Sequence, residues 1–277
     1  MLGNAAAYHE GYFSWPVFLL ALLTATLFQV ISNFANDYGD YVHGADSDAR
    51  EGPRRAVESG TLSKQEMKRG IIICSLLSVI STVLLLYLSF PAVGWTGVGI
   101  LFLLGLLSII AAITYTASSN PYGYRGWGDP AVFIFFGLLA VMGAFYLHTG
   151  FLNAFIVFPA LVMGFLSTAV LNVNNTRDLE SDKKAGKQSI AVMLGERGAR
   201  LYHGLLILAG FVALLGFLFY YFSMVEMLIG VLFYIPALYN FIAVLRTPGG
   251  SAMGPYLKQM VLSSLIAVIA LSLILVI

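Results

Sequence analysis

Long stretches that are almost free of charged residues dominate this chain and limit the folds that it can adopt. Each stretch approaches the roughly 20 residues that a helix needs to cross the apolar core of a bilayer. The stretches are continuous and do not alternate between apolar and polar residues, so we expect helices and not the strands of a membrane barrel. Eight spans are predicted, at residues 12–35, 70–89, 93–117, 130–148, 152–175, 201–222, 225–245 and 257–277.

The composition agrees with a membrane environment. Charged residues make up 10% of the chain, compared with about 25% in soluble domains. The only cysteine, Cys74, excludes a disulfide within the chain and a cysteine-based metal site. We therefore predict an all-α polytopic membrane protein that lies in the lipid bilayer and has no nucleic acid as a partner.

The basic residues predict how the spans are oriented. All fifteen Lys and Arg residues fall in alternate connections, those after the first, third, fifth and seventh spans. Because such segments stay on the cytoplasmic side, we expect them to face the cytoplasm of a bacterial-type inner membrane. Residues 1–8 read like the end of a further helix, so the expected bundle has eight full spans and the remnant of a ninth.

An acidic motif, N-F-A-N-D-Y-G-D-Y-V-H-G-A-D-S-D at residues 33–48, follows the first predicted span. If the helix continues into the motif, four side chains at i, i+3, i+4 and i+7 share one face. These are Asn33, Asn36, Asp37 and Asp40. The oxygen atoms of this face are candidates for binding a cation.

A second acidic motif, V-N-N-T-R-D-L-E-S-D, follows the fifth predicted span and places Asn174, Asp178 and Asp182 at i, i+4 and i+8. Each motif is followed by a basic loop and three more spans. This order indicates a parallel internal repeat, with halves at about 12–148 and 152–277 around a central cavity. We expect the whole chain to form one transmembrane domain in which the two motifs meet.

Oxygen atoms are the only ligands that both motifs offer, and such ligands select hard cations such as Mg²⁺. Simple solvation is the plainer interpretation of charges at a helix end, but two helically spaced sets on one side of the membrane exceed what solvation requires. We expect about two ions. The candidate ligands are Asn36, Asp40, Asp46, Asn174, Asp178 and Asp182.

Basic residues near both motifs are candidates for neutralising the outer oxygens of a diphosphate. Their alternative role is purely topological, as charges that keep loops in the cytoplasm. The diphosphate candidates are Arg54, Arg55, Lys183 and Lys187.

A third segment, I-T-Y-T-A-S-S-N-P-Y-G-Y-R-G-W-G-D-P at residues 113–130, lies on the same side between two predicted spans. An aromatic belt at the interface would account for its Tyr and Trp residues, but not for Arg125 and Asp129 among three glycines. We predict a lid over a cytoplasmic cavity, with Tyr115, Tyr124 and Arg125 against the substrates.

Together these motifs resemble those of the UbiA-type superfamily of intramembrane aromatic prenyltransferases. The first motif is similar to its N-D-x-x-D signature and the second to its D-x-x-x-D signature. Three further stretches resemble the 1,4-dihydroxy-2-naphthoate prenyltransferase branch of menaquinone synthesis: G-P-R-R-A-V-E-S-G-T-L-S, Y-R-G-W-G-D and N-T-R-D-L-E-S-D-K-K-A-G-K-Q-S-I-A-V-M-L-G. The likeness covers nearly the whole chain, although this superfamily usually has nine spans and often another Asp in place of Gly44.

The resemblance implies that a polyprenyl diphosphate and 1,4-dihydroxy-2-naphthoate react to give demethylmenaquinone, diphosphate and CO₂. Mg²⁺ held by the two motifs would stabilise the leaving diphosphate, and aromatic side chains would shield the allylic carbocation. The implied catalytic residues are Asp37, Asp40, Asp178 and Asp182.

Two alternatives stay open at this point. The same fold could prenylate another acceptor, such as 4-hydroxybenzoate, homogentisate, haem or chlorophyllide. A cation-coupled secondary transporter would also combine internal repeats with acids in the membrane. Its acids, however, are expected near the middle of the bilayer, and the acids of this chain lie beside basic loops at the ends of the predicted spans.

Overall fold

The structure, a computed structural model, describes residues 1–44 and 55–277, and the regular structure in these residues is helical throughout, as predicted. The helices are α1 (Leu2–His9), α2 (Trp15–Val42), α3 (Lys64–Thr114), η1 (Tyr122–Arg125), α4 (Gly128–Val132), η2 (Phe133–Leu139), α5 (Ala140–Thr149), α6 (Ala154–Arg177), α7 (Leu179–Lys184), α8 (Ile190–Tyr221), α9 (Met224–Arg246), η3 (Gly250–Met253) and α10 (Gly254–Ile274).

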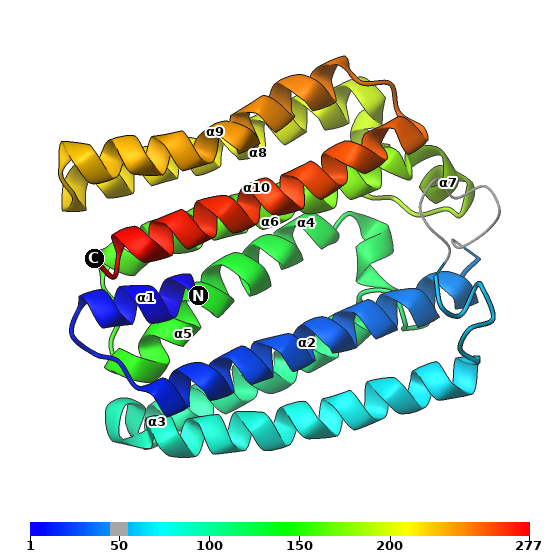
Figure 1. Ribbon diagram of the computed structural model, residues 1–277. Coiled ribbons are helices and arrows are strands. Elements are labelled where there is room, and N and C mark those ends of the chain that lie inside the picture. Colours follow the sequence, from blue (N-terminus) through cyan, green and yellow to red (C-terminus); the bar gives the residue numbers. More distant parts are fainter. Residues whose placement is uncertain (45–54) are drawn as a thin grey trace.

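Seven helices in the described part of the chain are long and apolar enough to cross a membrane. One of them, α3, is 51 residues long and contains two of the predicted spans. It folds back on itself (Figure 1) where Gly94 leaves helical geometry with a φ of 61°, a conformation readily open only to glycine. The chain is an integral membrane protein built as a helical bundle.

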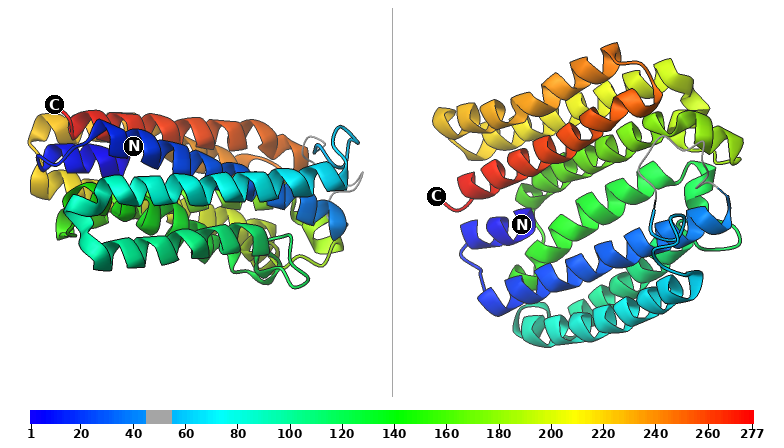
Figure 2. Two further views of the ribbon diagram at one scale, coloured as in Figure 1. Left: turned by 90° about the horizontal axis from the view of Figure 1, so that it is seen from below. Right: turned by 45° about the vertical axis from the view of Figure 1, so that its right-hand side comes forward.

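The long helices run side by side in one bundle (Figure 1). Helices α6, α8, α9 and α10 form one side, α2 and the two arms of α3 form the other, and the run from α4 to α5 lies between them (Figure 2). The short α1 packs against α5 and α10 at the end of the bundle that holds both termini. The two acidic motifs lie at the opposite end, where α2 ends and α7 lies.

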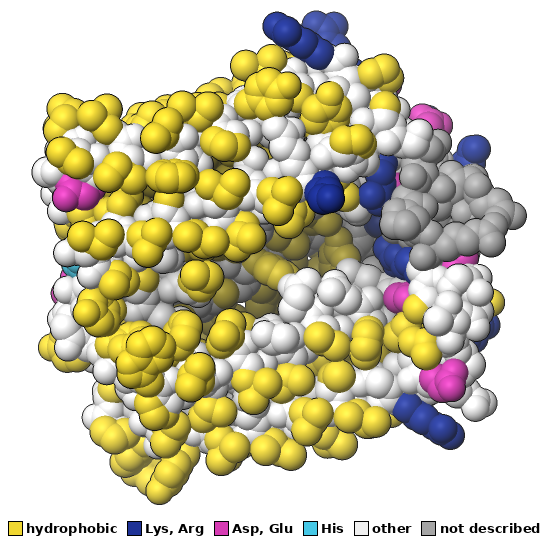
Figure 3. All heavy atoms as spheres, in the orientation of Figure 1, with side chains coloured by type: hydrophobic (Ala, Val, Ile, Leu, Met, Phe, Trp, Pro, Cys, Tyr) yellow, Lys and Arg dark blue, Asp and Glu magenta, His cyan; other side chains and the backbone are white. Residues whose placement is uncertain are grey.

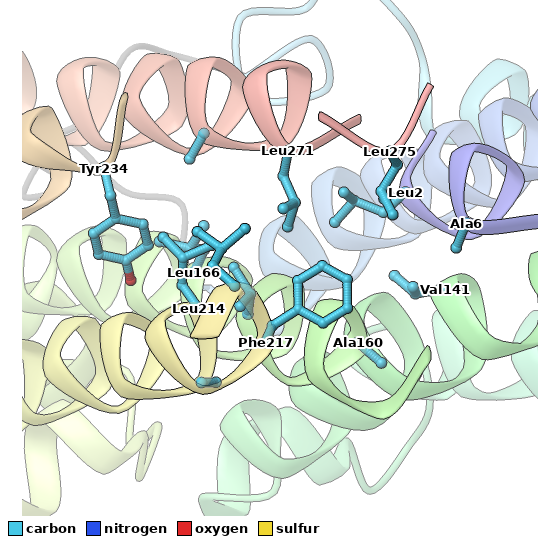
Figure 4. Packing of buried hydrophobic residues seen from close by; sticks show 14 of the residues in the cluster. Leu2, Ala6, Val141, Ala160, Leu166, Leu214, Phe217, Tyr234, Leu271 and Leu275 are labelled. Atoms are coloured by element: carbon cyan, nitrogen blue, oxygen red, sulfur yellow. The ribbon is translucent and has the colours of Figure 1, made fainter. Parts of the chain in front are cut away.

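The two sides of the bundle have separate apolar cores. The larger core includes Phe217 of α8 and Leu271 of α10 (Figure 4). The polar side-chain atom drawn in Figure 4 is the Tyr234 hydroxyl oxygen. This hydroxyl donates a hydrogen bond to the Ile207 carbonyl oxygen at 2.9 Å and so stays paired inside the core. The smaller core joins α2 to α3 through Ile31, Ala35, Ile71 and Ile109.

The outer surface shows how the bundle sits in lipid. Hydrophobic side chains cover most of the face in Figure 3, and the Lys and Arg side chains gather towards the end that carries the acidic motifs. A hollow opens on this face between α10 and α2 and reaches that charged end (Figure 3). Apolar surface of this extent would be unfavourable in water but suits contact with lipid chains.

Candidate active site

Residues 33–42 of the first acidic motif lie on the last turns of α2, so the helix continues into the motif as predicted. Asp40 is 4% exposed, and both of its carboxylate oxygens accept short hydrogen bonds. The Arg55 guanidinium donates to Oδ2 at 2.6 Å, and the Tyr124 hydroxyl donates to Oδ1 at 2.7 Å. Hydrogen bonds to an ionised group are stronger than neutral ones. Asp40 therefore ties α2 to two segments that follow later in the chain.

Asp37, in contrast, binds backbone. Its Oδ2 accepts the N–H of Ala56 at 3.0 Å, and its Oδ1 accepts the N–H of Val57 at 3.3 Å. These bonds fix the segment that carries Arg55, whose guanidinium also donates to the Asn36 carbonyl oxygen at 2.7 Å. In this structure Asp37 positions a cation beside the site.

The chain that follows α3 packs closely on the first motif at Gly39. A Cβ at this position would lie 2.4 Å from the carbonyl carbon of Thr116, so only glycine permits the approach. The Thr116 hydroxyl then donates to the Ala35 carbonyl oxygen at 2.9 Å and lies 3.1 Å from Oδ1 of Asn36. The glycine of N-D-Y-G-D is thus the contact point for the segment 115–126.

The second motif lies where α6 ends and α7 begins, and Asp178 separates the two helices. The Arg177 guanidinium donates two parallel bonds to the Asp178 carboxylate, from Nε to Oδ1 and from Nη2 to Oδ2, both at 2.7 Å. Its Nη2 also donates to Oδ1 of Asn174 at 2.9 Å. A bidentate pair fixes orientation as well as distance. Three polar residues of the motif are therefore locked together.

Lys187 connects the two motifs. Its Nζ lies 3.3 Å from each carboxylate oxygen of Asp182, and its charge also acts on Asp40. Burial lowers the pKa of Lys187, but the two carboxylates more than offset this effect, so the pKa lies above its ordinary value. The ammonium group also lies 5.6 Å from the centre of the Tyr124 ring. Two acids that are far apart in the sequence therefore face one cation.

In the described part of the chain, one carboxylate oxygen of Asp182 is free to accept a further ligand. It is buried, and its Oδ2 makes no hydrogen bond of good geometry with the described residues, although Lys187 lies within ion-pair distance. Burial raises the pKa of Asp182 to about 6, and Lys187 opposes part of that rise. A buried carboxylate oxygen with a free lone pair is costly unless something binds it.

The segment 115–126 contacts the first motif at Asp40 and, at Gln188, the chain that follows the second motif. The Tyr124 carbonyl oxygen accepts the backbone N–H of Gln188 at 2.9 Å. The rings of Tyr115 and Tyr122 meet edge to face, 5.4 Å apart, a contact worth roughly 1 kcal/mol. Burial and the nearby carboxylates raise the pKa of the Tyr124 hydroxyl, so it stays a hydrogen-bond donor.

The other predicted residues have different positions. Lys183 and Arg125 are exposed and are not part of the buried cluster of acids and cations. Asp46 and Arg54 lie outside the described residues. Sequence reasoning gave Arg177 only a topological role, although its place directly before an acid of the second motif was a signal for the ion pair.

The residues present fit Mg²⁺ that arrives with a diphosphate. Within residues 1–44 and 55–277, no three His, Cys, Asp or Glu side chains form a group that could hold a metal ion. Mg²⁺ does not need such a cage, because it is usually bound by one or two carboxylates together with substrate phosphates and water. The donors are oxygen atoms, and Oδ2 of Asp182 is buried without a hydrogen-bond partner in the described residues.

Comparisons with known proteins identify the family. The UbiA prenyltransferase family matches residues 1–265. The chain belongs to this family. The fold is also that of a solved structure, a UbiA homolog from Archaeoglobus fulgidus bound to DMAPP and Mg²⁺, with a TM-score of 0.62 at 20% identity over 98% of this chain and 94% of that one.

Relatives with assigned names are more similar in sequence. The 1,4-dihydroxy-2-naphthoate octaprenyltransferase of Escherichia coli (strain K12) is 47% identical over 214 residues, which are 77% of this chain and 69% of that protein. The protein of the same name from Haemophilus influenzae is 46% identical over 198 residues, 70% of this chain and 63% of that protein. The resemblance to the naphthoate branch is confirmed.

Proposed function

We propose that this protein transfers a polyprenyl group from a polyprenyl diphosphate to 1,4-dihydroxy-2-naphthoate, with loss of diphosphate and CO₂, to give demethylmenaquinol, the hydroquinone form of demethylmenaquinone. The convergence of the two acidic motifs on Lys187 supports this proposal. So do the names of the relatives that are 47% and 46% identical. The proposed site faces the cytoplasm, because the basic residues of the chain gather around it.

The end of the site that holds the acids and cations suits ionisation of the prenyl diphosphate. Bound Mg²⁺ would neutralise negative charge that develops on the leaving diphosphate. The side chains that would hold about two ions are Asn36, Asp40, Asn174, Asp178 and Asp182, with Asp46 of the undescribed segment as a further candidate. Lys187 and Arg55 lie beside these acids and bind the outer diphosphate oxygens. Asp37 positions Arg55 through the backbone that follows it.

The apolar part of the site suits the rest of the substrate. The hollow between α10 and α2 is lined by hydrophobic side chains (Figure 3) and gives the polyprenyl tail a path that avoids water. The rings of Tyr115 and Tyr124 shield the allylic carbocation and stabilise it through their faces.

The bundle is built from two halves, residues 12–148 and 152–277, in this proposal. Counting the two arms of α3 as separate spans gives eight, four in each half. Each half then opens with a helix that ends in an acidic motif, α2 in the first and α6 in the second.

The test is an assay of purified protein in lipid vesicles with labelled prenyl diphosphate, Mg²⁺ and one acceptor at a time. We expect a prenylated naphthohydroquinone and one CO₂ per product with 1,4-dihydroxy-2-naphthoate. We expect little product with 4-hydroxybenzoate or homogentisate. Product with another acceptor and none with the naphthoate would overturn the assignment of the acceptor but not that of the family.

A further inference from the structure

Asp129 is a buried acid to which the diphosphate end of the site gives no role. It is the second residue of α4 and is 3% exposed. Its Oδ2 has no hydrogen-bond partner among the described residues. Burying a carboxylate oxygen without a partner costs stability. A carboxylate that is kept in this state is a candidate for chemistry.

Two tyrosine hydroxyls flank Asp129. The hydroxyl of Tyr202, on α8, interacts with the carboxylate. The hydroxyl of Tyr115 packs on the preceding residue, because a Cβ added at Gly128 would lie 2.9 Å from it. Burial raises the pKa of the Tyr115 hydroxyl to about 12, and the charges of Asp40 and Asp129 add to this effect.

Tyr115 is the link between Asp129 and the rest of the site. The Tyr115 hydroxyl is within reach of the charges of Lys187, Asp40 and Asp129. Asp129 interacts with the Tyr202 hydroxyl, and the Tyr115 hydroxyl lies beside Gly128, the residue before Asp129. Tyr115 therefore links this buried carboxylate to the acids and the cation of the two motifs.

We propose that Asp129 takes up, through the Tyr115 hydroxyl, the proton that the aromatic acceptor loses during prenyl transfer, and then returns it. The idea rests on the proposed function. In this proposal Asp129 is a positioning residue that holds the proton and acts through Tyr115. The acceptor is then an aromatic ring with a hydroxyl group next to its carboxylate-bearing carbon.

The proton balance of the reaction requires such a group. When the allylic carbon bonds to the carboxylate-bearing ring carbon, the neighbouring hydroxyl becomes a ketone. Its proton passes to the Tyr115 oxygen, and the tyrosine proton passes to Asp129. The bond to the carboxylate then breaks, CO₂ leaves, and the electron pair restores the aromatic ring with an anionic oxygen. That oxygen takes the proton back along the same path, so the cycle consumes no proton and yields the hydroquinone form of the product.

The experiment compares Asp129→Asn and Tyr115→Phe with wild type. Both changes keep shape but interrupt the path of the proton, so we expect kcat with the naphthoate to fall about 10²–10³-fold. The KM for prenyl diphosphate should stay within about threefold, since neither change removes a diphosphate contact. The double variant should be no slower than the single ones, because the two residues act in one path.

A second readout separates acceptor chemistry from ionisation. Prenyl diphosphate labelled with ¹⁸O at the bridging oxygen exchanges that oxygen with non-bridging positions when it ionises and recombines without acceptor. Asp129→Asn should keep this exchange at the wild-type rate, which also shows that the variant folds. Asp129→Glu should recover part of kcat. Tyr122→Phe is the matched control, because the Tyr122 hydroxyl donates to the Ala111 carbonyl oxygen at 3.0 Å.

Three results would overturn the inference: a kcat of Asp129→Asn within about threefold of wild type, a loss of oxygen exchange together with kcat, or a further loss of activity in the double variant. Failure of the proposed function looks different. In that case wild-type protein itself would exchange the oxygens of prenyl diphosphate but form no product from the naphthoate.

Discussion

The two acidic motifs reach the same site by different routes. In the second motif, Arg177 lies one position from Asp178, which it binds, and Lys187 lies five positions from Asp182. In the first motif, Asp40 binds Arg55, 15 positions along the chain, and Tyr124, 84 positions along the chain. The contacts of the second motif form within one stretch of chain. The contacts of the first motif are complete only when the segment 115–126 packs against α2.

Because of this difference, we expect the two motifs to respond differently to substitutions elsewhere in the chain. Changes that displace the segment 115–126 should weaken the first motif and leave the ion pair of Arg177 and Asp178 intact. Changes at Lys187, which acts on acids of both motifs, should affect both. Loss of either central acid should stop the reaction, however that acid is held.

The strongest test removes the central acids. Asp40→Asn and Asp182→Asn keep shape but remove charge, and each should lower turnover about 10³-fold or more, because both carboxylates stabilise charge around the leaving diphosphate. Turnover is measured in vesicles at saturating Mg²⁺. Glu180→Gln is the control, since Glu180 is exposed on the same helix as Asp182. A variant of either central acid with a tenth of wild-type activity would contradict the shared role.

Lys187→Met removes the cation common to both motifs. We expect turnover to fall about 10²-fold and the metal-free protein to unfold at a lower temperature. Removing one partner of a buried ion pair costs roughly 3–5 kcal/mol. Thermal unfolding in detergent without Mg²⁺ measures this effect. Lys183→Met, at an exposed position, should change the free energy of unfolding by less than about 0.5 kcal/mol; equal shifts for the two variants would show that Lys187 does not bridge the motifs.

Gly39→Ala tests the docking of the segment 115–126. The added methyl group meets the Thr116 backbone, and overpacking of this kind costs roughly 1–3 kcal/mol. Turnover should fall because the next residue is Asp40, whose position depends on the same backbone. The matched control is Gly99→Ala in α3, where a Cβ meets nothing within 4 Å and a helix former replaces glycine. Similar activity in the two variants would remove Gly39 from the account.

Tyr124→Phe should have the smallest effect of the four. It deletes the hydroxyl that donates to Asp40 but keeps the ring. A hydrogen bond to a charged group contributes roughly 1.5–3 kcal/mol, so kcat/KM for prenyl diphosphate should fall at least about tenfold. Tyr122→Phe should leave kcat/KM unchanged. If the two variants behave alike, the link from the segment 115–126 to the first motif is not functional.

The sequence could predict what depends on local pattern. Length and apolarity predicted the spanning helices, and helical spacing predicted that Asp40 lies on α2 with Asn36 one turn earlier. The type of ligand atom predicted the preference for a hard cation. Each of these properties is set by residues close together in the chain.

Contacts between distant segments could not be predicted in this way. Nothing near Gly39 in the sequence indicates that Thr116 packs on it, and nothing near Tyr124 indicates that its hydroxyl donates to Asp40. The sequence predicted a role for the Tyr124 ring beside the carbocation and gave no indication of this hydrogen bond. The break in α3 is a related case, because the sequence predicts a connection between the spans 70–89 and 93–117, whereas the helix reverses at Gly94 without an intervening loop.

Binding of a non-hydrolysable prenyl diphosphate analogue in the presence of Mg²⁺ tests most directly whether the two motifs form one site. Affinity is measured for wild type, Asp40→Asn, Asp182→Asn and the double variant. We predict that each single change removes most of the affinity and that the double variant loses little more, because both acids act on one ligand. Two losses that add in full, or a single variant that binds as tightly as wild type, would contradict the shared site.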